Sequence, residues 1–139
     1  MAGEAGGDEG EESPREIDAF DLPDWVGTDH VTWTAMSSVH AGAHVQGRLE
    51  GTADERDGLP CDLLAVDRAY PRPVLDEKWR TRAHQAWTHG QVLLVEYDAQ
   101  LTLAVPGTGF TADAVLEAVG RLAKAVGAAP DTFVVALRL

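Results

Sequence analysis

Several residue types and sequence features are scarce in this chain, and each scarcity removes a class of function. Cys61 is the only cysteine, so no disulfide forms within the chain, and we expect a cytoplasmic location. No apolar run approaches the ~20 residues of a membrane-spanning helix, and no secretory signal is expected from the first residues. With 11 basic and 23 acidic residues, the net charge of -12 argues against nucleic acid or membrane partners.

The amino-acid usage is also skewed. Asn is absent, Ile occurs once, and lysine is rare against arginine, while alanine, glycine and valine are frequent. This skew indicates a GC-rich bacterial source. The length of 139 residues predicts a single folded domain.

Acidic residues are concentrated at the N-terminus. Residues 1–24 hold nine acids and one base, and the first twelve contain hardly any large apolar side chains. Such a segment buries too little apolar surface to offset its chain entropy. The sequence therefore predicts an acidic, largely disordered tail over 1–24 and a single α+β domain over 25–139. A short helix capped by Ser13 and ending before Pro23 is an alternative for the end of the tail.

Alternating apolar and polar residues predict the first strands. The alternation runs through residues 29–50 and is interrupted by the small residues 41–43, which predicts a hairpin with a three-residue loop. Because paired positions must share a face, that loop would pair Val39 with Val45 and His40 with His44. A third strand is expected over 61–70.

Helical periodicity and capping residues predict two helices. The first spans 73–89, with Trp79 and Trp87 on its apolar stripe. The second spans 112–126 and begins after Thr111, a favourable N-cap. Two strands lie between the helices, joined by a three-residue turn at 98–100, and a last strand covers 132–139.

The element order is therefore βββαββαβ, typical of an α+β fold. We expect a two-layer sandwich, with one mostly antiparallel sheet of about six strands and two helices on one face. The runs 63–66 and 92–95 are apolar on both sides, so a second face needs cover. A second copy of the chain is the simplest source of that cover, which predicts a homo-oligomer.

Two histidines are the best candidates for a chemical site. In the expected hairpin, His40 and His44 lie side by side and could share a metal ion. A third ligand, such as His84, His89 or Asp62, would have to come from elsewhere in the fold. Because the chain has no metal-binding motif, we expect no metal or other cofactor, and His40 and His44 are weak metal candidates only.

Other reactive residues have ordinary structural explanations. Cys61 follows Leu-Pro and opens an apolar strand, which is typical of a core residue rather than a nucleophile. Trp79 and Trp87 could line a ligand or partner site, but packing against the sheet explains the same spacing. The glycine-rich residues 106–109 precede a helix without the spacing of a phosphate-binding loop.

Three strands, a helix, two strands and a helix, in an acidic chain of about 15 kDa, form an order that resembles type III secretion chaperones and related peptide-binding chaperone domains. The resemblance implies a non-catalytic intracellular domain, adaptor or chaperone-like, that binds a protein partner. The alternative is a small ligand- or metal-binding protein, or a small enzyme, that uses His40 and His44.

Overall fold

A computed structural model describes residues 15–28, 30–40, 42–51, 58–67, 75–97 and 99–138. Its strands are β2 (Arg15–Glu16), β3 (Val31–Ala35), β4 (His44–Val45), β5 (Gly47–Glu50), β6 (Leu59–Ala65), β7 (Leu93–Tyr97), β8 (Gln100–Val105) and β9 (Phe133–Ala136). Its helices are α2 (Asp24–Thr28), α3 (Glu77–Thr88) and α4 (Ala112–Ala125), with short 3₁₀ turns η1 (Ala19–Asp21) and η2 (Pro130–Thr132).

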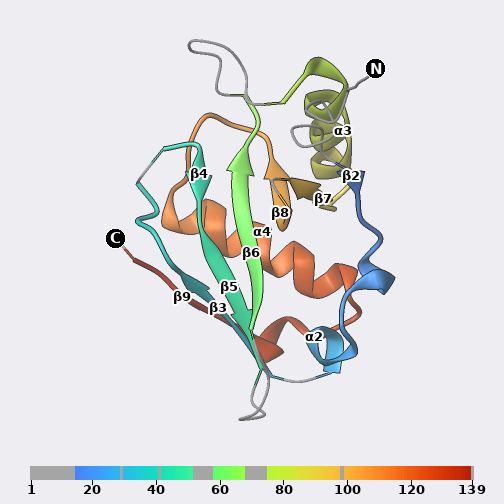
Figure 1. The fold of residues 1–139 in the computed structure, drawn as a ribbon, viewed down its shortest axis with the longest axis vertical. Helices are drawn as coiled ribbons and strands as arrows, with labels where there is room; N and C mark the ends of the chain where they lie inside the picture. Colours follow the sequence, from blue (N-terminus) through green and yellow to red (C-terminus); the bar gives the residue numbers. More distant parts are fainter. Residues whose placement is uncertain are drawn as a thin grey trace, which may run out of the picture.

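One mixed sheet organises the chain, as Figure 1 shows. The strand order is β2-β7-β8-β6-β5-β3-β9, and β4 also pairs with β6. Neighbouring strands run antiparallel except β3 with β9 and β6 with β8, which are parallel. The predicted α+β class is confirmed. Among the described residues, no helix has the length and apolar character needed to cross a bilayer.

The first hairpin has a different register from the expected one. Trp33 lies opposite Leu49 and Ala35 opposite Gly47, whereas the expected pairing of Val39 with Val45 would place Ala35 opposite Leu49. The strand β3 ends at Ala35. The chain then approaches the residues after β9, where the Val39 N–H donates to Arg138 O at 2.8 Å. Gly47 explains the shift, because it alone leaves room for the Trp33 ring on the sheet surface.

The second hairpin also differs, by one residue. Tyr97 pairs with Gln100 across a two-residue turn in which Ala99 has a φ of +63°. The expected three-residue turn rested on keeping apolar residues on one face. That reasoning fails here because β7 and β8 are largely buried on both faces. Apolar side chains are therefore buried whether the turn has two or three residues.

The two long helices cover opposite faces of the sheet, which corrects the prediction that both lie on one face. Successive strand residues point to opposite faces, and Leu63 joins a cluster that includes Val119 of α4. Leu64 joins a second cluster that includes Ala83 of α3. The apolar runs in β6 and β7 are therefore covered within one chain, and this reason for expecting a second copy no longer holds.

Residues 15–24, which the sequence places in the tail, contact the sheet. The strand β2 pairs with the edge of β7, and the Ile17 N–H donates to Leu94 O at 2.9 Å. Ile17 and Leu22 pack against the larger cluster. A strand and a 3₁₀ turn stand where the alternative predicted a helix, while residues 1–14 lie outside the described residues.

Both long helices begin at the capping residues that fit their sequences. Asp76 accepts the Trp79 N–H and starts α3, while Thr111 accepts the Ala114 N–H and starts α4 as predicted. The expected start of the first helix at Pro73 lies outside the described residues. The apolar stripe of α3 faces the sheet, with Ala83 fully buried and both tryptophans partly buried.

Replacing either tryptophan of α3 should destabilise the protein without abolishing folding. Complete burial of a tryptophan would make truncation to alanine cost about 3–5 kcal/mol. Because Trp79 and Trp87 keep part of their surface in solvent, we expect about 2 kcal/mol for each. Chemical denaturation of Trp79→Ala and Trp87→Ala checks this, with exposed Gln85→Ala as the control. Midpoints equal to wild type would show that the helix is wrongly phased.

Candidate functional site

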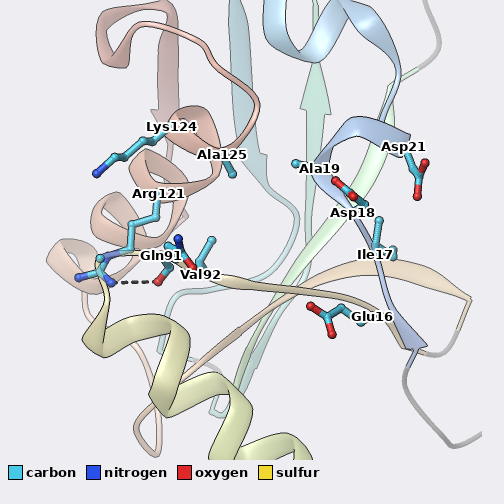
Figure 2. A pocket seen from close by; sticks show the side chains of 11 residues that line it. Glu16, Ile17, Asp18, Ala19, Asp21, Gln91, Val92, Arg121, Lys124 and Ala125 are labelled. Atoms are coloured by element: carbon cyan, nitrogen blue, oxygen red, sulfur yellow. Dashed lines mark hydrogen bonds between the residues drawn. The ribbon is translucent and has the colours of Figure 1, made fainter.

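A groove of about 690 Å³ separates the N-terminal segment from the end of α4 and is the best candidate site. Figure 2 shows the two sides of this groove, with Gln91 and Val92 between them. It is lined by Glu16, Ile17, Asp18, Ala19, Asp21, Gly90, Gln91, Val92, Arg121, Lys124 and Ala125. Residues from three distant parts of the sequence therefore meet here because β2 pairs with β7.

Apolar side chains lie between two charged rims of opposite sign. Ile17, Ala19, Val92 and Ala125 provide the apolar surface. In Figure 2, the carboxylates of the N-terminal segment lie on one side, and the cationic side chains of α4 lie on the other. This arrangement suits a ligand with an apolar portion and charged groups beside it.

Arg121, one of the two cations of this rim, is held in place by several contacts. Its Nη1 donates to Trp87 O at 2.8 Å and to Gln91 O at 2.9 Å, and its Nε donates to Glu117 at 2.8 Å. The guanidinium also stacks on the Trp87 ring, with 3.6 Å between its carbon and the ring centroid. Trp87, predicted as a candidate binding residue, thus helps to position the rim and is not itself among the lining residues.

The acidic rim is shaped by local hydrogen bonds. Asp18 caps η1 by accepting the Phe20 N–H at 3.0 Å. Glu16 forms an ion pair with Arg82 of α3, while Asp21 is exposed. Phe20 stands beside this rim with 90% of its surface exposed. The exposed carboxylates and the large aromatic ring are together suited to contact with another molecule.

The two predicted histidines are held by different parts of the fold. His40 is exposed in the loop after β3, where its backbone N–H donates to Ser38 Oγ at 3.0 Å. His44 starts β4 opposite Leu64, and its Nε2 lies 2.8 Å from Asp62 Oδ2. The hairpin register that pairs His40 with His44 is not found, because β3 has already ended at Ala35.

Asp62 is the buried polar residue that holds His44. Only 4% of its surface is exposed, and its second carboxylate oxygen accepts the Gly47 N–H at 3.2 Å. The neighbouring Cys61 is completely buried, and this burial, together with the Asp62 charge, raises the pKa of its thiol well above the usual range. The thiol is therefore a poor nucleophile, in agreement with a core role.

The expectation that the chain binds no metal, with His40 and His44 as weak candidates only, stays a prediction. Within the ranges that the structure describes, no group of three or more histidine, cysteine, aspartate or glutamate side chains is placed to hold a metal ion. Of the three possible third ligands, Asp62 does reach His44, while His84 instead bonds Asp67. Trp79 is predicted as a candidate residue for ligand or partner binding, not for a metal. Its side chain packs on the smaller cluster, with Lys78 and Arg82 near its ring.

A second, smaller groove of about 440 Å³ runs along α3 beside Asp67 and His84. The His84 Nε2 lies 2.9 and 2.8 Å from the two Asp67 oxygens, and the Gly107 N–H donates to the same carboxylate at 2.8 Å. Burial raises the pKa of Asp67, but these hydrogen bonds and the charges of His84 and Arg80 outweigh that effect and lower it. Through these two contacts Asp67, which follows β6, links α3 to the loop after β8.

Sequence reasoning missed most of the larger groove. Its acidic rim belongs to residues assigned to a tail, and no sequence pattern singled out Arg121. The apolar Ile17 and Leu22 within the charged segment were the available signal that this part of the chain packs on the domain. Comparison with known proteins finds no matching family model, no matching curated protein and no matching solved structure.

The Asp67 contacts predict an acid-dependent loss of stability. A carboxylate with a lowered pKa stabilises the fold above its unfolded pKa of about 3.9 and loses that contribution as the pH falls through the folded value. Since both side chains are partly exposed, we expect Asp67→Asn to cost about 1 kcal/mol at pH 7 and less at pH 3. Urea unfolding at both pH values measures this, and exposed Asp21→Asn is the control. A cost that is equal at both pH values would contradict the assignment.

Proposed function

We propose that this protein is a non-catalytic binding domain, adaptor or chaperone-like, that holds an extended segment of a protein partner in the groove beside α4. The observation that carries the proposal is the apolar strip between two charged rims. An extended peptide presents apolar side chains and charged side chains at regular spacing, and it matches such a surface along its length.

Charge indicates the kind of segment that fits. The chain carries a net charge of -12. Three carboxylates line the groove against two cations, and Glu16 is already paired with Arg82 as Arg121 is with Glu117, which leaves Asp18 and Asp21 against Lys124. A basic partner is therefore attracted to this surface, and its apolar side chains would cover Ile17 and Val92. We infer a segment in which basic and apolar residues alternate.

The same proposal includes the location and the assembly of the protein. We place it in the cytoplasm, where its single buried cysteine stays reduced. We also propose that it self-associates. The surface responsible is not the pair of apolar strands at the centre of the sheet, because α3 and α4 already cover them.

Filling the groove should abolish peptide binding without unfolding the protein. Ala125 is exposed on the groove side of α4, so Ala125→Trp places an indole on the apolar strip. The probe is an end-capped hexapeptide of alternating arginine and leucine, and titration is followed by ¹⁵N–¹H NMR shifts. We expect shifts at the groove residues in wild type and at least a tenfold weaker affinity in the variant, because the strip is occupied.

Two controls make this experiment decisive. Gly120→Trp adds the same side chain to α4 at an exposed position where a Cβ would have no neighbour within 4 Å, and it should leave binding unchanged. A hexapeptide of alternating glutamate and leucine should bind at least tenfold more weakly than the basic one. Equal binding of both peptides, or full binding by Ala125→Trp, would overturn the proposal.

A further inference from the structure

The strand β9 forms the edge of the sheet opposite to β2. It pairs with β3 on one side, and within the described residues no strand pairs with its other side. Figure 1 shows this strand at the border of the molecule, next to the C-terminus. A sheet edge of this kind presents a row of backbone donors and acceptors to any strand that can align with it.

The side chains of β9 leave this edge open to pairing with another strand. Its sequence is Phe-Val-Val-Ala, without the lysine, proline or inward-pointing charge that commonly protects an edge. Val134 is 58% exposed. On the other face, Phe133, Val135 and Leu137 pack against the main cluster but remain partly exposed. A strand added at this edge would cover both sets.

We infer that β9 pairs in an antiparallel manner with β9 of a second copy, so that two sheets join across a twofold axis. This inference rests on the proposed self-association and names the surface responsible for it. An axis perpendicular to the sheet keeps each α4 on the same face of the joined sheet. Directly opposed residues must then share a face, which allows Val134 to face its own counterpart or Val135 to face its own.

Charge favours a second copy as the occupant of this edge. Residues 129–138 contain one acid, Asp131, and one base, Arg138, so the edge is neutral in a protein that carries -12 overall. In either alignment, Asp131 of one copy approaches the end of the strand that carries Arg138 of the second copy. Glu16, the acidic residue of β2, lies at the opposite edge of the sheet.

A charge on the edge should separate the copies. Sedimentation equilibrium of the full chain at about 50 μM should give wild type twice the 14.9 kDa chain mass. Val134→Lys should give a single chain mass. In the dimer, the lysines of the two copies would be buried opposite or beside each other, and their like charges would repel. Phe20→Lys, a charge at a more exposed position outside β9, should retain the wild-type mass.

Cysteine cross-linking provides a second readout that does not depend on the stability of the lysine variant. Cys61 is buried, so Val134→Cys or Val135→Cys introduces the accessible thiol. Mild oxidation should link one of these variants into a covalent dimer, since opposed strand residues lie within disulfide range. Phe20→Cys should stay unlinked. A wild-type protein of single chain mass would overturn both the self-association and this interface. A dimer that survives Val134→Lys and forms neither cross-link would overturn the interface alone.

Discussion

The contact between Trp33 and Gly47 is the constraint on which the two halves of the sheet depend. A Cβ on Gly47 would lie 2.2 Å from the indole ring, so only glycine lets the ring rest on the strand. The indole Nε1 donates to Cys61 O at 2.8 Å, while Asp62 accepts the Gly47 N–H. Side chains thus replace part of the backbone ladder where β6 passes from pairing with β5 to pairing with β4.

The remaining architecture follows from the position that these contacts give to β6. Its parallel pairing with β8 leaves β7 beyond β8, and β7 in turn receives the N-terminal segment as β2. Side chains on alternate sides of β6 enter separate clusters, under α4 and under α3. The groove therefore lies where the N-terminal segment, the residues before β7 and the end of α4 meet, and neither Asp62 nor His44 lines it.

Local sequence patterns predicted the elements better than their arrangement. Thr111 and the apolar stripe of α4 identified a helix correctly because capping and periodicity are local properties. Strand register depends on distant packing, and the space above Gly47 could not be read from residues 29–50 alone. The groove combines three separate parts of the chain, so its Arg121 and Asp18 carried no common signal in the sequence.

A double-mutant cycle at the centre of the sheet tests the account most directly. Gly47→Ala in the wild-type background should cost about 3 kcal/mol or more, because the new methyl group overlaps the indole ring. Trp33→Phe removes the overlapping ring atoms, so the same glycine substitution should then cost less than about 1 kcal/mol. Denaturant unfolding of the four proteins gives the coupling free energy. A coupling near zero, with the two costs simply adding, would contradict the central role of this contact.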